Sequence, residues 1–93
     1  MVVGITTVEL TIPESNSLKD KRQVLRSMLD GIRRRFNVSA AEVDHLDLWR
    51  RATVGIAAVS NEQKYLDQLL ASVTRWIEEN PRVNVMDIQV EFL

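Results

Sequence analysis

The chain has 93 residues, of which 45% are hydrophobic and 27% charged, with 12 basic and 13 acidic side chains. That composition predicts one globular domain with a single core, spanning residues 1–93. Cysteine is absent, which excludes disulfides, thiolate metal sites and cysteine nucleophiles. No apolar run approaches the roughly 18 residues that cross a bilayer, and residues 1–5 lack the basic flank of a signal peptide. We therefore expect a cytoplasmic protein that does not contact a membrane.

The first third of the chain predicts a strand followed by a helix. Apolar and polar residues alternate from residue 2 to 12, as in a strand with one buried face. Pro13 ends that strand because proline has no N–H to give to a sheet. Ser17, three residues before Asp20, resembles a capping box. Apolar residues at helical spacing then predict an amphipathic helix of about five turns over residues 18–35.

The remaining sequence predicts two more strands, a second helix and a final strand. Residues 37–43 form a short strand, and the small residues of the apolar run 51–60 favour a central position in a sheet. Ser60 or Asn61 is expected to cap the second helix. Residues 86–92 alternate strictly between apolar and acidic or polar, which predicts a half-buried strand.

The resulting order is β-α-β-β-α-β, with two similar β-α-β halves. Right-handed crossovers place the first two strands parallel, with the third between them and the fourth on the outer edge of the first. We therefore predict a ferredoxin-like α+β sandwich, in which a four-stranded antiparallel sheet of order 4-1-3-2 carries both helices on one face.

Four stretches, SLKDKR (17–22), FNVSAAEV (36–43), DLWRRA (47–52) and VSN (59–61), together resemble the bacterial YlxP-like family, a small family of unknown function. The resemblance covers essentially the whole chain and implies the same ferredoxin-like fold. It implies no catalytic residue, because none is established for the family. Genes of this family often lie beside genes for translation initiation and ribosome maturation, which implies by association a role near the ribosome.

The basic residues are unevenly distributed, because nine of the 12 lie between residues 19 and 51. The predicted topology brings the start of the first helix and the 44–50 connection to one end of the sheet, together with Arg82. Cations gathered there could neutralise several phosphates, whereas an ordinary solvated surface with local counter-charges is the alternative. We therefore predict a non-enzymatic RNA- or ribosome-associated protein, whose binding residues are Lys19, Lys21, Arg22, Arg26, Trp49, Arg50 and Arg51.

Three large aromatic side chains have two different expected environments. Trp49 lies in a connection, where an indole either folds back onto its own domain, which is the more common arrangement, or contacts a partner. In the second case it would stack on a base beside its two arginine neighbours. Tyr65 and Trp76 lie at the edge of the apolar stripe of the second helix and are expected in the core.

The sheet face opposite the helices is predicted to be acidic and without aromatic rings, which excludes base stacking of the kind that RRM domains use. Its outward residues are expected to be Thr7, Glu9, Thr11, Asp87, Gln89 and Glu91. The same face is predicted to carry a small apolar patch that either pairs two copies in a homodimer or stays half-exposed on a monomer. That patch is formed by Val3, Ile5, Thr53, Gly55 and Ala57.

No arrangement of residues typical of an enzyme or of a metal centre is evident. The three glycines are isolated, so there is no glycine-rich phosphate loop. The only histidine, His45, stands near Glu42, Asp44 and Asp47, but the spacing matches no metal-binding motif. We therefore expect no catalytic residue, no metal and no cofactor.

Overall fold

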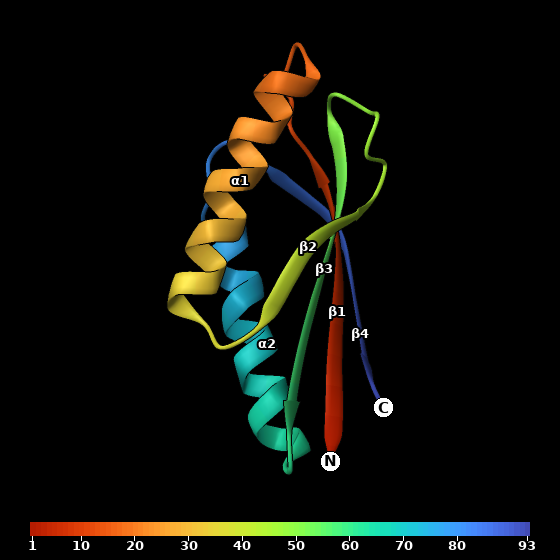
Figure 1. Ribbon diagram of the computed structural model, residues 1–93, viewed down its shortest axis with the longest axis vertical. Coiled ribbons are helices and arrows are strands. Elements are labelled where there is room, and N and C mark those ends of the chain that lie inside the picture. Colours follow the sequence, from red (N-terminus) through yellow and green to blue (C-terminus); the bar gives the residue numbers. More distant parts are fainter.

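The helices and strands follow one another in the order that the sequence predicts (Figure 1). The computed structural model describes residues 1–93. The six elements are β1 (Val2–Thr11), α1 (Leu18–Arg35), β2 (Ser39–Asp44), β3 (Arg51–Ser60), α2 (Gln63–Glu78) and β4 (Asn84–Phe92).

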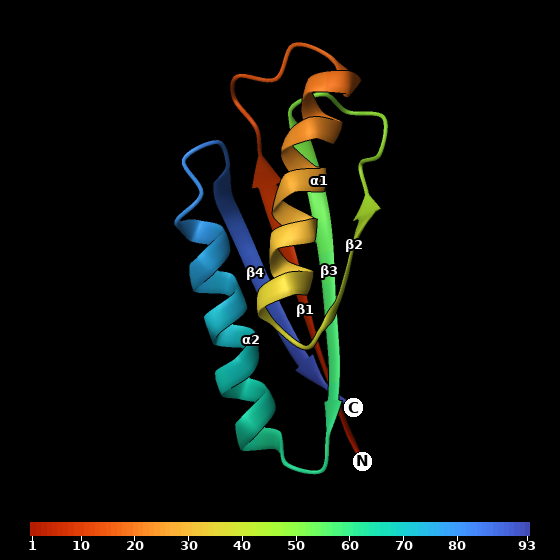
Figure 2. The same ribbon diagram turned by 60° about the vertical axis from the view of Figure 1, so that its left-hand side comes forward.

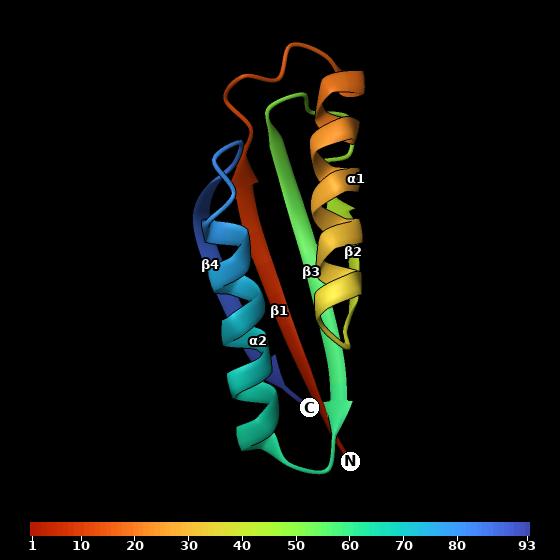
Figure 3. The same cartoon turned by 90° about the vertical axis from the view of Figure 1, so that its left-hand side faces the viewer.

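The four strands form one antiparallel sheet in the order β2-β3-β1-β4, with β2 and β4 at the edges. Both helices cover the same face of this sheet, and the opposite face carries no helix (Figures 1, 2 and 3). The predicted ferredoxin-like α+β sandwich and its strand order are therefore confirmed. Neither helix combines the length and hydropathy that a membrane span requires.

Alternation along β1 decides which side chains enter the core. Val8 and Leu10 are fully buried beneath the helices, whereas Glu9 between them points to the open face. The other central strand, β3, pairs with β1 so that Val54 lies opposite Val8 and Ala52 opposite Leu10. The helices close the core with the buried apolar residues Leu25, Met28, Leu29, Ile32, Leu70, Val73 and Ile77.

A hydrogen-bonded cap fixes the start of α1. Ser17 Oγ accepts a bond from the Asp20 N–H at 3.0 Å, as the predicted capping box requires. The Asp20 carboxylate reaches back to accept from the Asn16 N–H at 3.0 Å. The first bond satisfies an N–H group that the helix itself cannot pair, and the second holds the β1–α1 turn against the first turn of α1.

Three local predictions are corrected by the structure. Glu62 occupies the N-cap position of α2 without a side-chain bond, and Ser60 Oγ instead accepts from the Glu62 N–H at 3.2 Å. The strand β4 begins at Asn84, two residues earlier than predicted. Its pairing with β1 shifts register at Met86, so the alternation is interrupted there and Val85 packs against the core. Tyr65 is 49% exposed, so only Trp76 packs against the core.

Candidate nucleic-acid interface

The β1–α1 turn, the first turns of α1 and the β2–β3 loop lie together at one end of the molecule, the upper end in Figure 1. Side-chain bonds tie these segments to each other. Arg50 Nε donates to the Ser15 carbonyl at 2.9 Å, and its terminal nitrogen donates to Asn16 Oδ1 at 3.2 Å. Lys21 Nζ donates to the His45 carbonyl at 2.7 Å. Residues that are distant in the sequence therefore share a surface, as the topology predicts.

Lys21 is the one predicted binding residue that this arrangement encloses. Its side chain is 1% exposed, and its ammonium lies 2.7 Å from Glu42 Oε2 as well as on the His45 carbonyl. An ammonium with these two partners has neither the exposure nor the unpaired charge that a phosphate contact needs. Because Lys21 precedes the buried Leu25 by one helical turn, it lies on the core side of α1, and the periodicity already contained that signal.

The β2–β3 loop is held at its beginning by an unusual backbone conformation. His45 has a φ of 60°, the left-handed region that few residues other than glycine adopt. Its N–H donates to Asp44 Oδ1 at 2.7 Å, and its carbonyl accepts from the Leu48 N–H as well as from Lys21. The loop is therefore fixed at His45 and again at Arg50.

A polar network on the open sheet face continues from His45. His45 Nδ1 and Thr53 Oγ1 are 2.8 Å apart, and the Thr53 hydroxyl donates to Glu9 Oε2 at 2.8 Å. The guanidinium of Arg51 lies 3.5 Å from the same carboxylate oxygen, with its side chain about half exposed. Arg51 is thus partly neutralised, and His45 covers Thr53, which is only 4% exposed.

Trp49 does not fold back onto the domain. It is 54% exposed, and its neighbours Leu46 and Leu48 are 57% and 46% exposed. Together with Arg50 and Arg51 the indole borders a shallow hollow at the tip of the loop. Because the loop is fixed at both ends and His45 already occupies the adjacent sheet surface, no apolar recess receives the ring. The more common arrangement expected for a loop tryptophan is therefore wrong here.

The exposed flank of α1 carries cations without partners. Lys19, Arg22 and Arg26 are exposed and make neither an ion pair nor a side-chain hydrogen bond. Arg33 further along the helix is different, because its guanidinium lies 3.4 Å from Asp30 and donates to the Ala40 carbonyl. Three of the predicted binding residues are therefore free to meet an anion.

We call the exposed predicted binding residues of this end and of the adjoining flank of α1 the basic end surface. It comprises Lys19, Arg22, Arg26, Trp49, Arg50 and Arg51. The exposed carboxylates of Glu14, Asp44 and Asp47 belong to the same end of the molecule.

Comparison with known proteins identifies the family. Residues 3–90 match the family model described as "Protein of unknown function (DUF503)". The chain is a member of this family. It is 35% identical over 82 residues to "Uncharacterized protein YlxP" of Bacillus subtilis (strain 168), an alignment that covers 88% of this chain and 89% of the relative. The resemblance to the YlxP-like family is confirmed, and neither description names an activity.

The basic end surface gives this DUF503 protein two kinds of groups that single-stranded and looped nucleic acids engage. Lys19 and Arg26 are separated by seven residues, or about 10 Å along the helix axis, so the flank can meet more than one phosphate. The exposed indole of Trp49 offers a flat ring for an unstacked base. Arg50 is hydrogen-bonded to Ser15 and Asn16, yet it remains exposed next to that ring.

The open sheet face of the DUF503 protein carries the predicted polar residues, and the ring that lies on it is the imidazole of His45, which is hydrogen-bonded to Thr53. The register places Glu9 opposite both Asp87 and Thr53 on this face. A shallow apolar depression lies nearer the N-terminus of β1, lined by Ile5, Val43 and Ala57 among others. The sequence patch omitted Val43, whose methyl group would lie 3.0 Å from a Cβ at Gly55. Glycine there lets the β2 side chain lie over the central strand.

Proposed function

We propose that this DUF503 protein is a cytoplasmic, non-enzymatic RNA-binding protein that associates with the ribosome through the basic end surface. The observation that carries the proposal is the 54% exposed Trp49 in a loop fixed at both ends, beside Arg50 and the unpaired cations of α1. A loop that is ordered before binding loses little conformational entropy when it meets a partner. An exposed apolar ring there costs solubility, which a binding role would explain.

The chemistry of this surface implies affinity that is mainly electrostatic and low in sequence specificity. Cations on phosphates position a protein without reading bases, and one stacked indole tolerates any base. Each phosphate contact contributes about 0.7 to the slope of log affinity against log salt concentration for a single strand. With Lys19, Arg22, Arg26 and Arg50 engaged, the slope is expected to be about −3.

Binding of a fluorescently labelled ribosomal RNA hairpin, followed by anisotropy at increasing KCl, tests the proposal. The double variant Arg22→Ala/Arg26→Ala is expected to weaken binding and to reduce the magnitude of the salt slope by about 1.4. Lys64→Ala/Arg75→Ala is the matched control, because it removes the same charge from exposed positions of α2. The absence of binding at low salt, or an equal loss in both double variants, would contradict the proposal.

A second candidate function, self-association, is favoured by the apolar depression on the open sheet face. Val43 is 55% exposed at its border, and Val59, two residues beyond Ala57 on β3, is 61% exposed. A second copy of the face could cover both in a twofold dimer. Sedimentation velocity over a wide concentration range tests this. Ala57→Arg should abolish the dimer, whereas Gln89→Arg on the same face of β4 should not. A wild-type protein that stays monomeric throughout would exclude this candidate.

A further inference from the structure

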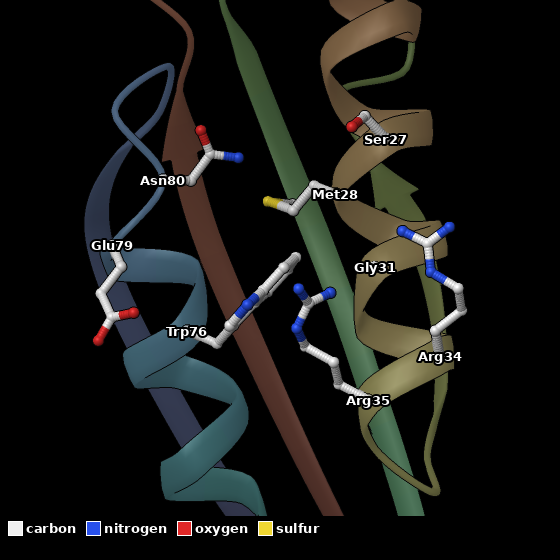
Figure 4. Close-up of a pocket in the computed structure, with 8 residues that line it drawn as sticks. All are labelled: Ser27, Met28, Gly31, Arg34, Arg35, Trp76, Glu79 and Asn80. Carbon is white, nitrogen blue, oxygen red and sulfur yellow. The ribbon is translucent and has the colours of Figure 1, made fainter.

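A cleft of about 400 Å³ lies between the second half of α1 and the C-terminal end of α2. None of the residues of the basic end surface lines it. Its lining comes from both helices, with Ser27, Arg34 and Arg35 on α1 and with Trp76 and Asn80 on α2 and the residues that follow it. Figure 4 shows the Trp76 ring and the Arg35 guanidinium side by side between the helices, whereas the Arg34 side chain lies along α1.

Close approach of the two helices forms the apolar part of the cleft. A Cβ at Gly31 would lie 2.5 Å from Trp76 Cη2, so the ring can reach α1 only because position 31 has no side chain. The guanidinium carbon of Arg35 lies 4.9 Å from the centre of the same ring. Trp76 thus spans the space between the helices, with one charged group held over its face and Met28 beside it (Figure 4).

The polar groups of the cleft are donors without acceptors. Arg34 and Arg35 have no carboxylate partner, although Arg33 in the same turn pairs with Asp30. Asn80 Oδ1 accepts from the Arg82 N–H at 3.0 Å, which leaves its NH₂ group unpaired. The Ser27 hydroxyl also lacks a partner and points toward the cleft (Figure 4).

Positive charge at this place is not by itself informative, because arginines at a helix C-terminus are favoured by the helix dipole. The informative observation is that the guanidinium groups of Arg34 and Arg35 both border this cleft and neither has an acceptor within the chain. The only carboxylate that lines the cleft, Glu79, points away from them (Figure 4). An oxyanion bound by these two groups would supply the acceptor that the chain does not.

We infer that this cleft binds the phosphate group of a small phosphorylated metabolite. A phosphate monoester presents three terminal oxygens and can accept from two guanidinium groups at once, which suits this pair better than a carboxylate does. The cleft volume of about 400 Å³ exceeds what a bare ion fills and lies in the range of small-molecule sites. Met28 and the free part of the Trp76 ring would contact the organic portion of the ligand. This site is separate from the proposed RNA surface.

Trp76 provides the readout for the test. In a Trp49→Phe background it is the only tryptophan, so its emission reports the cleft alone. Ribose 5-phosphate, inorganic phosphate and ribose are titrated at constant ionic strength set with NaCl. We expect a saturable change with ribose 5-phosphate at about millimolar concentration or below, weaker binding of inorganic phosphate and no response to ribose.

Arg34→Gln separates binding from a general effect on the ring, because Arg34 does not lie over Trp76. It should weaken ribose 5-phosphate binding at least about tenfold, since charged hydrogen bonds are the strong ones. The matched control Lys64→Gln on α2 should leave binding unchanged. A response that is linear in concentration and reproduced by NaCl, an unchanged constant in Arg34→Gln, or equal affinity for ribose and its phosphate would overturn the inference.

Discussion

The two tryptophans of the chain are both accompanied by arginines, yet their surroundings differ. Trp76 lies between the helices against Gly31, with Arg35 over its ring. Trp49 stands 54% exposed on a loop, next to Arg50. The difference shows that neither residue type nor the flanking charge decides burial. Trp76 packs between the helices because Gly31 leaves space for its ring. Trp49 stays exposed because hydrogen bonds at both ends of its loop hold it away from the core.

The comparison therefore depends on what holds each ring in place. Lys21, with its bonds to Glu42 and His45, fixes the loop that carries Trp49. Gly31 creates the space that Trp76 occupies. Substitutions at Lys21 and Gly31 test the residues that position the two rings, and a substitution at Trp49 tests a ring itself.

Removing the ammonium of Lys21 is expected to have the largest effect. Lys21→Met leaves the Glu42 carboxylate, 16% exposed, without its ion-pair partner. It also removes one of the two hydrogen bonds that the His45 carbonyl accepts. We expect a loss of about 2–4 kcal/mol in the free energy of unfolding, because removing one member of a buried ion pair leaves the other charge without its counter-ion. Urea denaturation measures this loss.

Two further variants sharpen the Lys21 experiment. Lys19→Met, on the exposed flank of the same helix, should change stability by no more than about 0.5 kcal/mol. Adding Glu42→Leu to Lys21→Met should recover part of the loss, because the stranded carboxylate is then removed. Equal stability of the wild type and Lys21→Met would show that the loop is held without this lysine.

Lys21 also illustrates what the sequence could and could not reveal. Hydrophobic periodicity predicted α1 over residues 18–35 and the strand order, because each depends on local pattern and on the handedness of crossovers. The spacing of Lys21 from Leu25 indicates the buried side of the helix, but the prediction followed its charge and assigned Lys21 to the binding surface. Its partner Glu42 lies on β2, and no local sequence pattern predicts an ion pair between residues so far apart in the chain.

The candidate site also contains features that the sequence could predict and features that it could not. Lys19, Arg22 and Arg26 could be assigned to one flank from helical spacing alone. The exposure of Trp49 could not, because it results from the left-handed backbone of His45 and from the bond between Arg50 and Ser15. The cleft beside Trp76 was also missed, since it requires knowing how closely the two helices approach.

Gly31→Ala is expected to have an intermediate effect. Alanine in a helix interior is ordinarily more stable than glycine by about 1 kcal/mol. Here the added methyl group would meet Trp76 at 2.5 Å, so the ring must move, and we expect a net loss of about 1–2 kcal/mol. Thermal denaturation measures the change, and the emission of Trp76 in a Trp49→Phe background should shift.

The cause of that loss can be checked by a second substitution. In a Trp76→Leu background the obstacle is smaller, so Gly31→Ala should become neutral or stabilising. If alanine destabilises equally in both backgrounds, the contact with the ring is not the reason for glycine at this position.

Trp49→Ala is expected to have the smallest effect on stability and a distinct effect on RNA binding. Because the ring has few contacts to lose, the free energy of unfolding should change by no more than about 0.5 kcal/mol. One stacked base is worth about 1–3 kcal/mol, so affinity for the RNA hairpin should fall about tenfold. Leu48→Ala removes a neighbouring apolar side chain of similar exposure and should cost little affinity, while Trp49→Phe should retain most of it. Equal losses in the alanine variants would point to general hydrophobic contact rather than stacking, and the proposed role of the indole would be wrong.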